Sequence, residues 1–234
     1  MTSIPGERTD KEAIMNLTTV EGMQSEIFVP ITPKPVFTEL KKPLSECKVA
    51  FITAGGIHKK DQTPFNTSGD FSYRTIPFDT PSDRLMVTHG GFDNSDINKD
   101  VNAMFPIDRL HELVDAGFIG SLADETYTFM GGGGNVEKFR EETGPEIARK
   151  LKEQGVDIVL CTGGCGTCHR SATIVTRCCE EAGMSCVVIA ALPPIARQQG
   201  APRITAPHVP IGSNAGEPNN IPQQTAIVKE SLEW

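Results

Sequence analysis

ValAspIleValLeu-CysThrGlyGlyCysGlyThrCys, residues 156–168, is the stretch of sequence that decides the fold. Its first five residues are a largely apolar run, typical of a buried strand, and its last eight are a glycine-rich loop. A helical segment follows at 169–182, which Gly183 ends, and a second apolar run follows at 186–190. A strand, a helix and another buried strand are the unit from which parallel sheets are built. We therefore expect an α/β protein with a single doubly wound, mostly parallel sheet and helices on both faces.

Strands and helices alternate along the rest of the chain. Further strands are predicted at 48–54, 85–89 and 126–130, and further helices at 107–116, at 135–153 with an interruption at Gly144-Pro145, and at 223–233. Residues 57–84 are predicted to be irregular, and residues 92–100 to form a loop. Glycine-rich turns end four of the strands, at 55–56, 90–91, 131–134 and 163–166. Ligands bind at the carboxyl edge of open α/β sheets, so these turns mark the expected site.

One domain is expected at 17–234, after a flexible N-terminus at 1–16. Prolines are dense at 17–43 and at 193–222. We expect both segments to be extended arms that lie on the domain or on a partner, because proline restricts the backbone and disfavours helix.

The composition argues against several classes of protein. The chain has 234 residues with 22 Lys and Arg against 30 Asp and Glu, so its net charge is −8 and it is not expected to bind nucleic acid. Apolar residues make up 38% and charged residues 22%, which is typical of a globular chain. No apolar run is long enough for a membrane span, and residues 1–16 lack the pattern of a secretory signal. We therefore expect a cytoplasmic protein.

The cysteine loop carries the predicted chemistry, because six of the seven cysteines lie between positions 161 and 186. In a reducing compartment such clustering indicates thiol chemistry or metal binding rather than a disulfide scaffold. Cys165 and Cys168 lie where a strand turns into a helix, and the positive end of a helix dipole favours a thiolate. Their spacing lets Cys168 attack a bond formed at Cys165, and His169 could move a proton. We predict Cys165, Cys168 and His169 to be catalytic.

Other interpretations of the loop remain open. Cys165-Gly-Thr-Cys168-His169 also matches the pattern of haem attachment, and Cys161, Cys165 and Cys168 have the spacing of an iron–sulfur ligand set. A zinc site would take His169 as a further ligand. The plainest interpretation is that all are small buried residues, which we expect for Cys178, Cys179 and Cys186. We predict no bound metal.

Candidate substrate-binding residues are the small residues of two turns. They are Thr162, Gly164, Gly166 and Thr167 in the cysteine loop, and Gly131 and Gly132 in the run Gly131–Gly134. Glycines let a backbone approach a ligand closely, and N–H groups before a helix can hold an anion, although a structural turn explains Gly131–Gly134 equally well. His89, Asp93 and Asp96 could bind a metal, but a loop capped by carboxylates is the simpler interpretation.

ThrGlyGlyCysGlyThrCysHisArg (162–170) resembles the active-site loop of the selenocysteine-containing subunits of the glycine, sarcosine, betaine and proline reductase family. Further stretches resemble the proline-reductase branch of this family: 53–56, 89–94, 98–108, 129–134, 141–152 and 189–194. The resemblance covers about residues 17–230 and does not extend to 1–16. The family has selenocysteine where this chain has Cys165. Either Cys165 is a natural cysteine form or it stands in for selenocysteine, in which case the haem and iron–sulfur interpretations lose their basis.

The resemblance implies an oxidoreductase subunit that opens the ring of D-proline reductively to give 5-aminovalerate. It implies that position 165 is the nucleophile and that Cys168 resolves the bond formed there. It also implies a hetero-oligomer with a separate pyruvoyl-bearing subunit, and an electron-donor protein or dithiol that reopens the Cys165–Cys168 bond. No cofactor is expected in this chain itself.

Other functions stay open at this point. The loop would also suit a general thiol–disulfide oxidoreductase, or a related amino-acid or betaine reductase subunit. A two-cysteine racemase needs thiols on facing loops, for which Cys47 is poorly placed. A scaffold without catalytic activity would use the proline-rich segments to wrap a partner.

Overall fold

The central strands form where the sequence has its longest apolar runs. The computed structural model describes residues 36–132 and 136–234. The central strands are β1 (Lys48–Thr53), β7 (Ile158–Thr162) and β8 (Ser185–Ile189). Every residue of β7 and β8 is buried. Burial on both faces is what a parallel sheet between two helical layers requires.

The main sheet has the strand order β3-β6-β1-β7-β8-β9, with β5 beside β1, which makes seven strands within the described residues. The remaining strands are β3 (Tyr73–Pro77), β5 (Ser121–Leu122), β6 (Glu125–Phe129) and β9 (Ile204–Thr205). All pairings are parallel except that of β3 with β6, which is antiparallel. The predicted α/β class with a mostly parallel sheet is confirmed.

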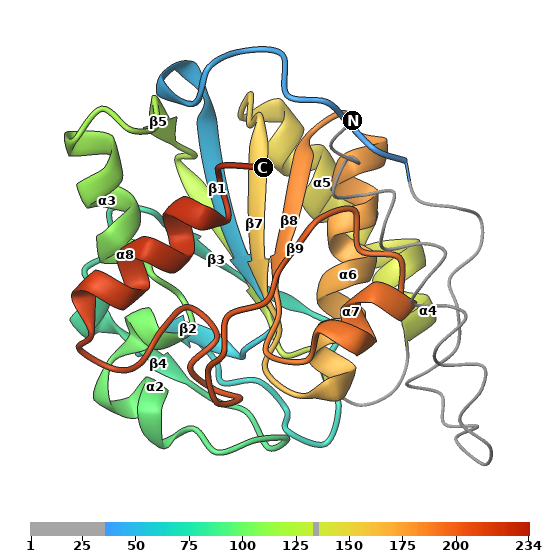
Figure 1. Cartoon of the computed structure of the whole chain (residues 1–234). Helices are drawn as coiled ribbons and strands as arrows, with labels where there is room; N and C mark the ends of the chain where they lie inside the picture. Colours follow the sequence, from blue (N-terminus) through green and yellow to red (C-terminus); the bar gives the residue numbers. More distant parts are fainter. Residues whose placement is uncertain (1–35, 133–135) are drawn as a thin grey trace.

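Helices cover both faces of this sheet (Figure 1). Helices α3 (Ile107–Asp115) and α8 (Ile221–Glu230) lie on one face, and α5 (Gly144–Glu153), α6 (Gly166–Glu181) and α7 (Pro193–Gln198) lie on the other. Short 3₁₀ turns lie at Leu44–Glu46, Ser82–Arg84 and Val101–Ala103. Within the described parts of the chain, no helix has the length and apolarity that a membrane crossing needs.

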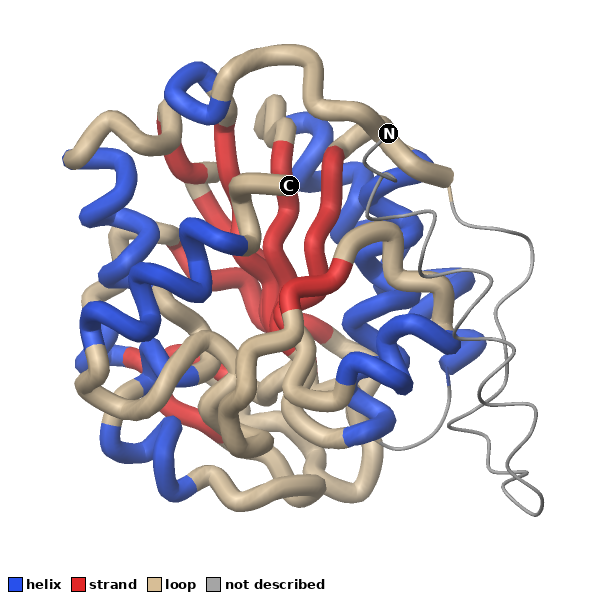
Figure 2. The backbone as a smooth tube through the Cα atoms, viewed as in Figure 1, coloured by secondary structure: helices blue, strands red, loops and turns tan. Residues whose placement is uncertain are grey.

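The strand order places a topological switch point beside the cysteine loop. From β1 the chain runs by way of α3 to β6 on one side, whereas from β7 it runs through α6 to β8 on the other side. Because these connections diverge, the carboxyl ends of β1 and β7 form a topological switch point, where open α/β sheets bind ligands. Figure 2 shows loops gathered at this edge of the sheet.

A second, two-stranded sheet lies below that edge. It pairs β2 (Ile57–Lys59) with β4 (Leu85–Val87) in antiparallel fashion, and α2 (Ser95–Lys99) follows it. The prediction that 57–84 is irregular is therefore wrong for β2 and β3. The strand expected at 85–89 is shorter and lies outside the main sheet, and the expected loop at 92–100 contains α2.

The expected helix break at Gly144-Pro145 takes the form of a π-helical turn. Helix α4 (Val136–Lys138) continues through a π turn at Phe139–Thr143 into α5. The N–H of Gly144 bonds to the carbonyl of Phe139, five residues earlier. The wider turn precedes Pro145, which has no N–H to donate, so the helix continues where proline would otherwise break it.

The segment 193–222 is not an extended arm. It contains α7 and β9, and residues 212–216 are buried. Pro193 and Pro194 occupy the first turn of α7, where the missing N–H groups cost nothing. The amide of Asn214 donates to the carbonyl of Gly163, which ties this segment to the cysteine loop. Of the other expected arm only 36–43 is described; the flexible N-terminus expected at 1–16 lies outside the described residues.

A buried ion pair joins three distant parts of the chain. Arg203 and Glu180 lie 2.6 Å apart with side chains 2% and 0% exposed. Glu180 also accepts from the backbone N–H of Cys186 at 2.7 Å, and Arg203 donates to the carbonyl of Thr38 at 2.6 Å. The guanidinium lies over the ring of Trp234. Burial raises the pKa of Glu180 and lowers that of Arg203, so only their mutual attraction and these hydrogen bonds keep both charged.

We predict that Glu180→Ala lowers the free energy of unfolding by about 3–5 kcal/mol, because it leaves the charge of Arg203 buried without its partner. Urea unfolding followed by circular dichroism measures this. The control is Glu153→Ala, which removes the exposed ion pair with Arg149 and should cost less than about 1 kcal/mol. An equal loss of unfolding free energy in the two variants would contradict a stabilising role for the buried Arg203–Glu180 pair.

Candidate active site

Cys165 and Cys168 form a close pair of thiols at the amino end of α6. Cys165 is the N-cap of this helix, and its sulfur accepts from the backbone N–H of Cys168 at 3.4 Å. The two Sγ atoms lie 2.7 Å apart, and both residues are free cysteines. The hydroxyl of Thr167 lies 3.0 Å from the Cys165 sulfur. The predicted nucleophile and resolving cysteine are therefore within reach of each other.

The surroundings give the two sulfurs opposite protonation states. The pKa of Cys165 falls to about 3, mainly through the hydrogen bond from Cys168, with further hydrogen bonds from His89 and Thr167, although burial opposes the shift. Burial, together with the neighbouring Cys165, raises the pKa of Cys168 well above its ordinary value. At neutral pH Cys165 is thus a thiolate and Cys168 a thiol that donates to it. Of these two residues, Cys165 is half-buried and Cys168 is fully enclosed.

His89 is the third side chain at this pair. It lies just beyond β4 and is 6% exposed, and its Nε2 lies 2.9 Å from the Cys168 sulfur. The backbone N–H of Gly91 donates to His89 Nδ1 at 2.8 Å, so the ring proton is on Nε2 and points at sulfur. The sequence indicated His89 only as a possible metal ligand. The available signal was its place at a strand end before Gly90-Gly91, one of the four glycine turns.

His169 has a different environment from the one its predicted role needs. It is fully buried, its Nδ1 lies 2.7 Å from the carbonyl oxygen of Cys165, and its Nε2 accepts from the N–H of Leu192 at 3.1 Å. Burial lowers its pKa, which favours the neutral ring. Both nitrogens thus bond to backbone groups. This arrangement holds the cysteine loop in place, and the histidine that reaches the sulfurs is His89.

Four glycines let the surrounding segments close around the pair. A Cβ on Gly131 would lie 2.7 Å from Cys168 Cα, and one on Gly163 would lie 2.8 Å from His169 Cα. A Cβ on Gly91 would lie 3.1 Å from the Cys165 sulfur, and one on Gly164 would collide with the ring of Phe92. Side chains at these positions would displace the loop, so the glycines define the shape of the site.

The predicted substrate-binding residues fall into two groups. Gly132, Gly166 and Thr167 are partly exposed. Thr162, Gly131 and Gly164 are buried, and the hydroxyl of Thr162 donates to the carbonyl of Met104 at 2.8 Å. The buried three support the loop rather than face solvent. Gly133 and Gly134 lie outside the described residues.

The side chains that could bind a metal in the structure are not the sets predicted from the sequence. Among the described residues, the side chains whose ligand atoms lie within 4.8 Å of one another are those of His89, Cys165 and Cys168. Cys161 lies in β7 and is not part of this group. Asp93 accepts from the N–H and hydroxyl of Ser95 at the start of α2, and Asp96 pairs with Lys99 within α2.

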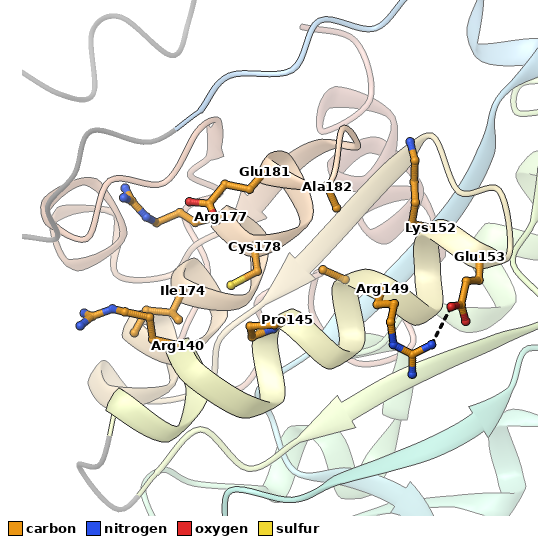
Figure 3. A pocket seen from close by; sticks show the side chains of 11 residues that line it. Arg140, Pro145, Arg149, Lys152, Glu153, Ile174, Arg177, Cys178, Glu181 and Ala182 are labelled. Carbon is orange, nitrogen blue, oxygen red and sulfur yellow. Dashed lines mark hydrogen bonds and ion pairs between the residues drawn. The ribbon is translucent and has the colours of Figure 1, made fainter.

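The other cysteines are placed for packing. Cys47, Cys161, Cys179 and Cys186 are buried. Cys178 is half-buried in a groove between α5 and α6, among the side chains of Arg140, Ile174 and Glu181 (Figure 3). Burial raises the pKa of Cys178 to about 12, which keeps this thiol protonated. The groove contains none of the predicted site residues.

Similarity to a known family covers most of the chain. The family model for glycine/sarcosine/betaine reductase selenoprotein B matches residues 11–164. The chain belongs to this family. It is 58% identical to D-proline reductase subunit gamma of Acetoanaerobium sticklandii, over 93% of this chain and 90% of that protein. No solved structure matches it.

More distant members of the reductase family are larger proteins. The chain is 33% identical to glycine reductase complex component B subunit gamma of Carboxydothermus hydrogenoformans, over 89% of this chain and 50% of that protein. It is 32% identical to sarcosine reductase complex component B subunit beta of Peptoclostridium acidaminophilum, over 85% of this chain and 48% of that protein. It therefore spans about half the length of these two relatives. The resemblance stated from the sequence is confirmed at the level of the family.

We predict that iodoacetamide alkylates Cys165 at a nearly constant rate from about pH 8 down to about pH 5, because its sulfur stays a thiolate across this range. An ordinary thiol slows about tenfold for each pH unit below its pKa. Mass spectrometry of the peptide containing Cys165 measures the rate, and Cys178 serves as the slow internal control. A tenfold fall in the alkylation rate of Cys165 for each pH unit across this range would show that its sulfur is protonated.

Proposed function

We propose that this chain is the redox-active subunit of D-proline reductase, which cleaves the ring of D-proline reductively to 5-aminovalerate. The observation that carries the proposal is the thiolate of Cys165 at the amino end of α6, 2.7 Å from the protonated sulfur of Cys168. Support also comes from the 58% identity to D-proline reductase subunit gamma across nearly the whole of both chains.

Cys165 supplies the nucleophile of the first step. Its thiolate attacks C2 of D-proline, an S–C2 bond forms, and the C2–N bond breaks with its electron pair moving to nitrogen, which takes a proton. A ring amine is a poor leaving group. A pyruvoyl carbonyl on a partner subunit would bind this nitrogen and make it leave more readily. Cys165 is the sulfur that such a partner can reach, because it is only half-buried while Cys168 is enclosed.

Cys168 completes the reduction in the second step. After losing its proton to water, its sulfur attacks the Cys165 sulfur, and the electron pair of the S–C2 bond moves to carbon, which takes a proton from water. The product leaves with two more electrons and two more protons than the substrate, and a Cys165–Cys168 disulfide remains. An electron-donor protein or dithiol then reduces this disulfide. We assign the substrate-facing positions to Gly166 and Thr167, which follow Cys165, and to Gly132; all three are partly exposed.

Position 165 is the proposed place of the family's selenocysteine. The family model is one of selenoproteins, and its matched residues end at Gly164, directly before Cys165. A helix N-cap with several hydrogen-bond donors suits an anionic selenium as well as a sulfur. The codon for residue 165 in the natural gene decides between selenocysteine and cysteine.

The test is reconstitution with a pyruvoyl-bearing reductase subunit. The pair should form a stable complex that converts D-proline to 5-aminovalerate with dithiothreitol as reductant, and the isolated chain should convert none. Cys165→Ala should abolish turnover, because no nucleophile remains. Product is measured by chromatography of the derivatised amine.

Two outcomes would reject this function. One is turnover by the chain alone, and the other is undiminished turnover by a complex that contains Cys165→Ala. As a matched control, Cys178→Ala removes a half-buried thiol on the same helix and should leave turnover within about twofold, since this thiol stays protonated.

A further inference from the structure

The second step places a demand on Cys168 that its burial opposes. Cys168 must become a thiolate to attack the Cys165 sulfur, yet its side chain is fully enclosed. In the resting pair its proton points at Cys165, whose charge disfavours a second anion. Once Cys165 has formed a bond to carbon, that charge is gone. Cys168 then needs a hydrogen-bond donor for its own developing charge.

His89 provides such a donor in a fixed orientation. The N–H of Gly91 donates to Nδ1 at 2.8 Å, which leaves the ring proton on Nε2, 2.9 Å from the Cys168 sulfur. The ring of Phe92 lies against the imidazole, with ring centroids 4.5 Å apart, and limits its rotation. Nothing needs to reorganise when charge appears on Cys168, and such preorganised donors are the most effective electrostatic catalysts.

We propose that His89 is a catalytic residue that stabilises the thiolate of Cys168 through its Nε2–H while Cys168 attacks the Cys165 sulfur. Because Nδ1 accepts from the N–H of Gly91, His89 acts here as a hydrogen-bond donor through Nε2 and not as a general acid. The effect of this hydrogen bond on product release rests on the proposed function. Its effect on the Cys168 sulfur is a property of this chain alone.

The same three side chains could be considered a metal site, but the second contact of His89 opposes this. A histidine that binds a metal through Nε2 carries its proton on Nδ1 and donates it to an acceptor. Here Nδ1 faces the N–H of Gly91, which is itself a donor. The geometry favours a proton on Nε2 over a metal ion there.

The experiment uses the reduced chain alone and a chromophoric aryl disulfide. Cys165 attacks the reagent and releases one coloured thiolate, leaving a mixed disulfide on Cys165. Cys168 then attacks the Cys165 sulfur, loses its proton to solvent and releases the second coloured thiolate, which leaves a Cys165–Cys168 disulfide. Stopped-flow absorbance separates the two phases. Cys168→Ser, which retains only the first, identifies the signal of each.

In His89→Ala we expect the second phase to slow by roughly ten- to a hundredfold, the size of one hydrogen bond to a charged group. The first phase should change less than about threefold, because the Cys165 thiolate persists at neutral pH without this donor. The first phase also reports that the amino end of α6 is intact. His89→Gln, which retains an N–H donor, should recover part of the second-phase rate. The exposed His208→Ala should leave both phases unchanged.

An unchanged second phase in His89→Ala overturns the proposal, as does an equal slowing of both phases, which would indicate a merely structural role. Stoichiometric binding of added zinc that blocks both phases and is lost in His89→Gln would also overturn it, by showing that Nε2 is a ligand. Failure of the reconstituted complex to reduce D-proline, with the two phases behaving as expected, would reject the proposed function and leave the role of His89 intact.

Discussion

The negative charge of Cys165 at the amino end of α6 is the interaction on which the site depends. A helix of 16 residues begins directly after this sulfur, and the sulfur accepts from the N–H of Cys168 and lies beside the hydroxyl of Thr167. The thiol of Cys168 is the strongest donor of the set. Burial and the negative charge of Cys165 together keep Cys168 protonated. The two cysteines therefore act in a fixed order.

The fold brings remote segments to this charge. The divergence of the chain after β1 and β7 places a topological switch point beside the cysteine loop. The small β2–β4 sheet then delivers His89 to a sulfur that lies 79 positions later in the sequence. On the other side, Asn214 holds the carbonyl of Gly163. The proline-rich segment that contains Asn214 is thus part of the framework of the site. Some of its backbone groups also bond within the chain: the N–H of Ala215 donates to the carbonyl of Ala103, and the carbonyl of Thr205 accepts from the N–H of Ala190.

Apolar runs and glycines were sufficient to predict the central strands, the helix after the cysteine loop and the pair Cys165–Cys168. The sequence did not predict β3, because it pairs antiparallel at the sheet edge and only Ile76 is buried. Helix α7 was missed because its two prolines start the helix and do not break it. The place of His89 depends on a contact between distant segments, and His169, adjacent to Cys168 in sequence, has both nitrogens on backbone groups. Neighbourhood in sequence was therefore a poor guide to which histidine meets sulfur.

The electrostatics at α6 bear on what cysteine does at the position proposed for the family's selenocysteine. A selenol is more acidic than a thiol, but the pKa of Cys165 is already about 3, so both would be anionic at neutral pH. The first step of the proposed chemistry thus gains little from selenium through ionisation. The second step differs, because Cys168 attacks the atom at position 165 while carbon leaves it, and selenium is the softer target with the weaker bond to carbon. Under the proposed chemistry, replacing selenium by sulfur at position 165 should slow the attack of Cys168 on that atom. It should change the ionised fraction of residue 165 much less. With sulfur at position 165, the rate of the second step therefore depends more strongly on Cys168 and on His89, the donor that faces it.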